Sequence, residues 1–163
     1  MKIKCIALDL DRTTLDSHGC LSKENKMAIE GAVAAGVHVA VASGRALDSL
    51  PEEITDIAGI RYAITSNGAA VYDLRERKCL RQFKMTPASA EDILRHTEPE
   101  RMKDVYGKTA EMPEAEASEI EISYEAFIDG RAFAESRYVA DPVRFGAMPQ
   151  AISYIQGTRT PVE

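Results

Sequence analysis

The sequence predicts an α/β fold: a parallel sheet with intervening helices in residues 1–84, followed by a separate α+β unit in residues 85–163. Short apolar, β-compatible runs alternate with segments of helical periodicity in the first half of the chain. Strands joined by helix-length crossovers run parallel, so this order requires a parallel sheet. Three of the strands also end in small polar clusters, which is typical of a ligand site at one edge of such a sheet.

The first strand is predicted at residues 3–8, which are mostly apolar at successive positions. Such a run is typical of a strand that is covered on both faces, so we expect it to be buried. It leads directly into Asp9, Asp11 and Thr13. Because alternate side chains of an extended chain share a face, these three side chains are expected to point the same way.

The next elements follow from caps and periodicity. They are a helix from Ser22 to near Gly36, a strand at 37–42, a helix at 46–58, a strand at 61–65 and a hairpin of 70–74 with 78–83. Pro51 fits the first turns of the 46–58 helix or a break between two short helices. His38 is expected to be a packed strand residue rather than a ligand.

Residues 85–163 have the pattern of a smaller α+β unit. We expect a helix from Thr86-Pro87 to about His96, a loop or weak helix without chemistry at 97–118, a hairpin of 120–128 with 131–139, and a helix at 148–155 closed by Gly157. The hairpin prediction rests on Asp129-Gly130, a pair that favours a type I′ turn. No internal repeat or low-complexity segment is present.

The three polar clusters carry the chemistry. They are Asp9-Leu10-Asp11-Arg12-Thr13, Ser43-Gly44-Arg45 and Ser66-Asn67-Gly68-Ala69. Ligands of open parallel sheets bind beyond the carboxyl ends of the strands, so all three clusters are expected on one rim. Three clusters on the same rim are harder to attribute to chance than any single short motif.

Paired carboxylates favour phosphoryl transfer. Two carboxylates held close together resist ionising together, so one can be a nucleophile or metal ligand while the other carries a proton. A carboxylate that attacks a phosphate meets like charge, which Mg²⁺ with oxygen ligands would relieve. Ser43 and nearby backbone N–H groups could hold phosphate oxygens, and Arg45 could pair with a substrate anion.

Two of the clusters, and the nearby His18, also have a simpler interpretation. The run from Asp9 to Thr13 could be a solvated turn, because Asp and Thr are common turn residues. Ser43 could cap a helix next to an exposed Arg45. His18 lies in a turn-rich stretch beside the acidic cluster, and no partner spacing marks it as an acid or base.

The composition argues against several classes of protein, among them nucleic-acid-binding and membrane-spanning proteins. A net charge of -6 without a basic stripe argues against nucleic acid as a partner. No run approaches the length of a membrane span and no signal-peptide pattern opens the chain, so a cytoplasmic protein is expected. Cys5, Cys20 and Cys79 form no C-x-x-C pair, which predicts reduced thiols, two of them packed in strands.

The three motifs, in this order, resemble those of the haloacid dehalogenase-like superfamily, and more narrowly of its Cof-type sugar-phosphatase branch. Residues 124–131 and 157–161 look like cap segments of that branch. The resemblance implies a Rossmann-like parallel core with an α+β cap inserted after the third strand. It implies Asp9 as the nucleophile that forms an aspartyl-phosphate and Asp11 as the acid and base.

The same resemblance implies the remaining roles. Asp9 and the backbone carbonyl of Asp11 would bind Mg²⁺, and Thr13 would steady the Asp11 loop. The substrate or phosphate site would include Thr13, Ser43, Gly44, Arg45 and Asn67, and the substrate would be a small phosphorylated metabolite such as a sugar phosphate.

Two features depart from the family pattern. Arg12 stands where the family usually has Gly. The chain also stops at Glu163 and contains no Gly-Asp dipeptide, whereas such phosphatases return to the core with a Lys and a G-D-x-x-x-D-like motif. We therefore expect a chain truncated within the cap, weak binding of metal and phosphate, and an unpaired first-strand edge that favours a homodimer.

Two functions remain open from the sequence. One is a Mg²⁺-dependent phosphatase, and the other is a non-catalytic binding or assembly module derived from it. A phosphoryl-accepting receiver domain fits less well, because its acceptor Asp follows the third strand, where this chain has Ser66-Asn67.

Overall fold

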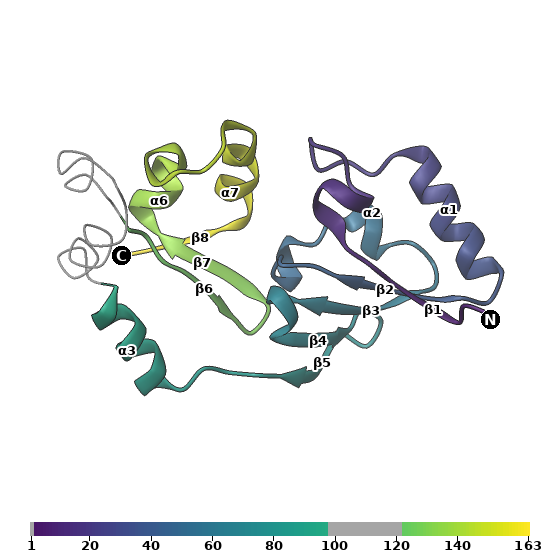
Figure 1. Cartoon of the computed structure of the whole chain (residues 1–163), viewed down its shortest axis with the longest axis horizontal. Coiled ribbons are helices and arrows are strands. Elements are labelled where there is room, and N and C mark those ends of the chain that lie inside the picture. The colour runs from purple at the N-terminus through teal and green to yellow at the C-terminus, as the bar shows by residue number, and fades with distance from the viewer. Residues whose placement is uncertain (1, 98–121) are drawn as a thin grey trace, which may run out of the picture.

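The computed structural model describes residues 2–97 and 122–163, which form two sheets (Figure 1). The first sheet has five strands in the order β1-β2-β3-β4-β5, and the second has three in the order β6-β7-β8. The first part contains β1 (Cys5–Leu8), α1 (Lys23–Ala34), β2 (His38–Ala42), α2 (Glu52–Thr55), β3 (Ile60–Thr65), β4 (Ala70–Asp73), β5 (Lys78–Gln82) and α3 (Pro87–His96). The second contains β6 (Glu125–Ile128), β7 (Arg131–Glu135), α6 (Ser136–Ala140), α7 (Ile152–Thr158) and β8 (Thr160–Val162).

The predicted α/β class is confirmed. β1, β2 and β3 are parallel neighbours, with Leu8 opposite Val41 and Val41 opposite Ala63. The hairpin of β4 and β5 extends this sheet antiparallel to β3, also as predicted. The core lies between the sheet and its helices and consists mainly of Leu10, Leu15, Ile29, Val39, Val41, Leu50, Ile54, Ile57, Ile60 and Ala63.

The capping residues in the sequence predicted both ends of α1 correctly. The Ser22 hydroxyl accepts a hydrogen bond from the Asn25 amide at 3.1 Å, which caps the first turn. Gly36 follows the helix with φ of 79°, a left-handed conformation that suits glycine. The predicted 46–58 helix is instead divided at Pro51 into a 3₁₀ turn (Leu47–Ser49) and α2. The sequence left two alternatives for Pro51, and the break between two short helices is the one observed. Pro51 lies directly before α2, where its missing N–H costs no helical hydrogen bond.

The prediction of a buried first strand is wrong. β1 is an edge strand that pairs only with β2 within the described residues, and its side chains are mostly exposed. Cys5 and Cys79, expected to be packed, are exposed free thiols because β1 and β5 are the two edges of the sheet. His38 is exposed as well, at the start of β2.

The second unit differs from its prediction in four places. Within the described residues, the strand predicted at 120–128 begins only at Glu125. The strand predicted at 131–139 ends at Glu135, and α6 follows so that Tyr138 packs edge-on against Phe145 with ring centroids 5.9 Å apart. The predicted 148–155 helix is a 3₁₀ turn (Pro149–Ala151) joined to α7, which continues through Gly157. β8 was not predicted, because a three-residue strand with a central proline gives little signal; it is tolerated as an edge strand beside β7.

Other expectations lie partly outside the described residues. These include nearly all of the 97–118 loop and the first two residues of the 120–128 strand. The helix after Thr86 is confirmed, and the Thr86 hydroxyl accepts a hydrogen bond from the Ser89 amide. Within the described residues, no helix has the length and apolar character needed to cross a membrane.

The two sheets meet at the turn between β6 and β7. Asp129 and Gly130 have φ of 48° and 84°, as the predicted type I′ turn requires. The Gly130 carbonyl accepts a hydrogen bond from the Asp48 amide at 2.9 Å, and Lys84 pairs with Asp129 at 2.8 Å. This hairpin tip therefore contacts the first sheet beside the loop that follows β2 (Figure 1).

Candidate active site

Asp9 is held at the end of β1 by a tight turn. The chain does not stay extended there, contrary to the alternation argument, but coils through a π-type turn (Leu10–Thr14) anchored by the fully buried Leu10. The turn brings the Thr13 hydroxyl to Asp9, where it donates to carboxylate Oδ2 at 2.7 Å. The Thr14 hydroxyl donates to the Asp9 carbonyl at 2.6 Å. Both bonds fix the position of the Asp9 carboxylate.

The ends of β2 and β3 are joined directly by backbone hydrogen bonds. The Ser66 amide donates to the Arg45 carbonyl at 2.9 Å, and the Asn67 amide donates to the Ser43 carbonyl at 3.4 Å. Gly44 leaves room for Asn67 at this junction, since a Cβ there would lie 2.9 Å from Asn67 Oδ1 and would displace the amide of that side chain. The second and third clusters thus form one continuous rim.

Arg45 connects this rim to the acidic cluster. Its Nη2 donates to Asp11 Oδ1 at 2.6 Å and its Nε to Asp11 Oδ2 at 3.1 Å, while Nη1 donates to the Ser49 carbonyl at 3.1 Å. The predicted convergence of all three strand ends is therefore confirmed. Burial alone would lower the pKa of Arg45, but the hydrogen bond that Arg45 donates to Asp11 and the attraction of Tyr154 and Asp11 together outweigh it, so the pKa lies above its ordinary value.

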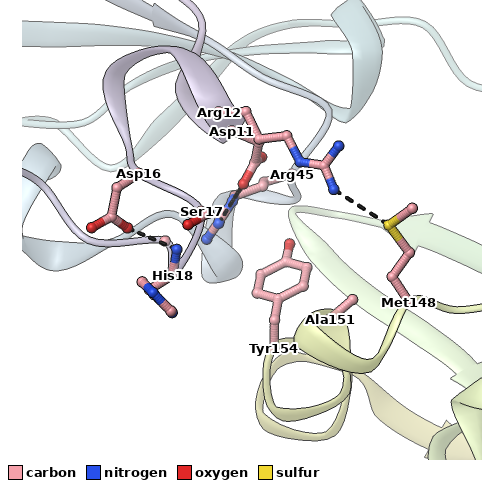
Figure 2. A pocket seen from close by; sticks show the side chains of 10 residues that line it. Asp11, Arg12, Asp16, Ser17, His18, Arg45, Met148, Ala151 and Tyr154 are labelled. Atoms are coloured by element: carbon pink, nitrogen blue, oxygen red, sulfur yellow. Dashed lines mark hydrogen bonds and ion pairs between the residues drawn. The ribbon is translucent and has the colours of Figure 1, made fainter.

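A cavity of about 420 Å³ lies in front of Asp11, between the loops of the first sheet and the segment around α7 (Figure 2). Its lining residues are Asp11, Arg12, Asp16, Ser17, His18, Gly19, Arg45, Met148, Ala151 and Tyr154. The Tyr154 ring lies against the guanidinium of Arg45, with the Arg45 carbon Cζ 4.3 Å from the ring centroid. The volume is in the range of small-molecule sites.

Sequence reasoning missed several of these lining residues. His18 was expected to be an ordinary loop residue, but it lines the cavity. The amides of His18 and Cys20 donate to Asp16 Oδ1 and hold the turn of this loop. These backbone bonds also lower the pKa of Asp16. Met148, Ala151 and Tyr154 come from a segment more than a hundred residues away, and no local pattern links them to the acidic cluster.

The acidic cluster offers few protein ligands to a cation. Among the described residues, no three His, Cys, Asp or Glu side chains gather in one place. The Asp9 carboxylate and the Asp11 carbonyl are oxygen donors, the type that Mg²⁺ prefers. This set fits a cation that retains several waters and shares ligands with a bound phosphate, as Mg²⁺ does.

Comparison with known proteins agrees with this geometry. A family profile described as haloacid dehalogenase-like hydrolase matches residues 6–125, which is most of the chain. The chain belongs to this family. The narrower Cof-type branch stays a prediction from the motifs.

Curated relatives of this haloacid dehalogenase-like protein are phosphatases. The 5-amino-6-(5-phospho-D-ribitylamino)uracil phosphatase YcsE of Bacillus subtilis is 38% identical over 82 residues, which cover 48% of this chain and 33% of that protein. Phosphatase YwpJ of the same organism is 35% identical over 71 residues, 44% of this chain and 25% of that protein. The matched stretch spans a third or less of the length of either relative.

Solved structures share the fold. A haloacid dehalogenase-like hydrolase from B. subtilis superposes with a TM-score of 0.64 at 23% identity, covering 98% of this chain and 54% of that chain. TM0651 from Thermotoga maritima gives 0.60 at 22% identity, with 99% and 50% covered. The sugar phosphatase BT4131, of subclass IIB, gives 0.52 at 17% identity, with 80% and 43% covered. This haloacid dehalogenase-like chain spans about half the length of those structures.

Proposed function

We propose that the protein hydrolyses phosphomonoesters of small metabolites, such as sugar phosphates, through a Mg²⁺-dependent aspartyl-phosphate intermediate. The observation that carries the proposal is the Asp9 carboxylate, held by Thr13 at 2.7 Å on the rim where the three strand ends meet. The phosphatase names of the curated relatives support the same reaction class.

Asp9 is the proposed nucleophile. Because Thr13 donates to Oδ2, the other oxygen, Oδ1, is the atom that attacks phosphorus. The bond between phosphorus and the leaving oxygen breaks as a bond between an Asp9 oxygen and phosphorus forms, and the leaving oxygen takes a proton from Asp11. For Asp11 to carry that proton, its ion pair with Arg45 must open. In the second step Asp11 takes a proton from water, whose oxygen attacks phosphorus and releases inorganic phosphate and the Asp9 carboxylate.

The rim supplies the proposed phosphate contacts. The Ser43 Oγ accepts a hydrogen bond from the Arg45 amide at 3.2 Å, so its hydroxyl proton is directed elsewhere and suits a phosphoryl oxygen. Asn67 is exposed beside Gly44, where its amide can reach the same group. Arg45 is committed to Asp11 and Ser49, so we assign it to holding Asp11 rather than to the phosphate.

Mg²⁺ would be held by the Asp9 carboxylate and the Asp11 backbone carbonyl. When bound, it would neutralise charge between the Asp9 carboxylate and the incoming phosphate. Thr13 contributes by fixing the orientation of the Asp9 side chain through Oδ2.

Hydrolysis of p-nitrophenyl phosphate by the full chain, with and without Mg²⁺, tests the proposal. We expect Mg²⁺-dependent turnover that Asp9→Asn lowers by at least about a thousandfold, because the nucleophile is lost. Asp92→Asn, an exposed carboxylate on α3, is the matched control and should retain activity.

Trapping of the intermediate gives a second readout. Acid-quenched protein should carry one phosphoryl group on Asp9 by peptide mass spectrometry, and none after Asp9→Asn. Absence of both turnover and phosphorylated Asp9 would instead favour a non-catalytic binding module. Turnover unchanged by Asp9→Asn would place the nucleophile elsewhere.

A further inference from the structure

Arg12 extends across the mouth of the cavity. It lies in the turn after β1, and its Nη2 donates to the Met148 Sδ on the opposite side at 3.4 Å (Figure 2). A thioether sulfur is a weak acceptor for a charged donor. Arg12 forms no ion pair within residues 2–97 and 122–163. Its positive charge therefore has no matching carboxylate in the part of the chain that the structure describes.

The other charged groups of the cavity already have strong partners. Asp11 and Arg45 neutralise each other at 2.6 Å. Asp16 Oδ1 accepts hydrogen bonds from the His18 and Cys20 amides at 2.8 and 2.9 Å. Arg12 is thus the lining cation that remains able to take an incoming anion.

The backbone of Arg12 is also strained. Its φ of 59° lies in the left-handed region, which non-glycine residues rarely adopt. Strain of this kind is concentrated at functional sites, where the side chain has a use. Here the conformation carries the guanidinium over the cavity, toward Met148.

We propose that Arg12 binds a second anionic group of the substrate, so that the preferred substrates are phosphomonoesters that also carry a carboxylate. This inference rests on the proposed function, in which the first phosphoryl group lies at Asp9. A guanidinium presents paired N–H donors that match the two oxygens of such a group. The anion would replace the weak contact with Met148.

Calorimetric titration of the full chain in Mg²⁺, with two matched pairs of probes, tests the inference. The pairs are 3-phosphoglycerate with glycerol 3-phosphate, and 6-phosphogluconate with sorbitol 6-phosphate. Within each pair a carboxylate replaces a hydroxymethyl group. We expect the carboxylate member of at least one pair to bind about tenfold more tightly. The net charge of -6 opposes that preference, so general electrostatics cannot produce it.

Variants separate Arg12 from overall charge. Arg12→Gln and Arg12→Gly should bind both members of a pair equally, and the glycine variant suits the left-handed φ, so it should fold. Arg75→Gln removes the same charge from an exposed hairpin residue and should keep the tenfold preference.

The outcomes distinguish the two proposals. If the unaltered chain binds the two members equally in both pairs, the Arg12 site is overturned, while the phosphatase proposal still stands. A preference that survives Arg12→Gln would also overturn it. Binding of none of the four probes would overturn both, because no phosphoryl site would exist.

Discussion

Individual residues at the rim adopt conformations that ordinary side chains avoid. Arg12, Ser66 and Asn67 all have positive φ, at 59°, 51° and 55°. The amides of Ser66 and Asn67 donate to the carbonyls of the second cluster, and Arg45 of that cluster bonds Asp11, the residue before Arg12. The family usually has Gly at the Arg12 position, and the left-handed backbone explains that preference. Strain in this protein therefore coincides with the proposed chemistry.

Gly59 is a position where glycine is required. It has φ of 105°, and a Cβ there would lie 2.2 Å from Cγ1 of Val33 in α1. We expect Gly59→Ala to lower the free energy of unfolding by more than about 2 kcal/mol, measured by urea denaturation. Gly31→Ala is the matched control, because nothing lies within 4 Å of its Cβ. Helix propensity predicts that Gly31→Ala raises stability by about 1 kcal/mol, so equal effects of the two variants would contradict the packing argument.

At the scale of elements, a buried carboxylate closes the hairpin of β4 and β5. Asp73 is 2% exposed, and its Oδ1 accepts hydrogen bonds from the Arg75 and Glu76 amides at 3.0 and 3.1 Å. Arg61 on β3 donates to its Oδ2 at 2.7 Å. Asp73 thus organises the turn and ties it to the neighbouring strand.

The same contacts make stability depend on pH. Burial raises the pKa of Asp73, but the hydrogen bonds from Glu76, Arg61 and Arg75 outweigh it, so the pKa lies below 3.8. A depressed pKa contributes stability that is complete above the unfolded-state value and is lost as the pH falls through the folded-state value. We expect urea denaturation to show this loss below about pH 3.8.

Asp73→Asn should be less stable than the unaltered chain at pH 7 and should lose less stability on acidification. Asp92→Asn, an exposed residue of α3, should keep the original pH dependence. If Asp73→Asn and the unaltered chain lose stability in parallel below pH 3.8, Asp73 is not the responsible group.

At the scale of the whole molecule, the two sheets meet through a few specific contacts. Gly130 lies at the hairpin tip, where a Cβ would be 3.1 Å from Leu47 Cβ and 3.2 Å from the Tyr72 hydroxyl. Tyr154 covers Arg45 from the same second unit. The cavity exists only because these contacts bring the two parts together.

Gly130→Ala should displace the hairpin tip. We expect hydrogen exchange of the Asp48 amide, which donates to the Gly130 carbonyl, to accelerate about tenfold or more. Gly146→Ala is the matched control. Gly146 has a positive φ of 83°, as Gly130 does, but nothing lies within 4 Å of a Cβ at that position. Faster exchange at Asp48 in both variants would attribute the effect to strain rather than to the contact.

We also propose that the chain forms a homodimer through the exposed edge of β1. Ile3 and Ile6 are 63% and 37% exposed beside it. We expect light scattering to show a concentration-dependent dimer that Ile6→Lys weakens. Ile93→Lys on α3, where the side chain is 47% exposed, should not weaken it. A monomer at all concentrations would contradict the proposal.

The sequence by itself determined the parallel order of the first three strands and the residues at their ends. Apolar runs, the Ser22 and Thr86 caps and the Asp129-Gly130 turn are local signals, and local signals survive in a single sequence. The meeting of the three polar clusters also followed from the sequence, because parallel strands place their carboxyl ends at one edge.

Only the tertiary structure decided which partners those residues have. The bond from Thr13 to Asp9, the commitment of Arg45 to Asp11, and the approach of Met148 and Tyr154 depend on a coiled turn and on contacts between distant segments. The exposure of β1 likewise depends on its place in the sheet, which residues 3–8 do not encode. Local patterns specify elements, but side-chain partners and burial are set by which elements pack together.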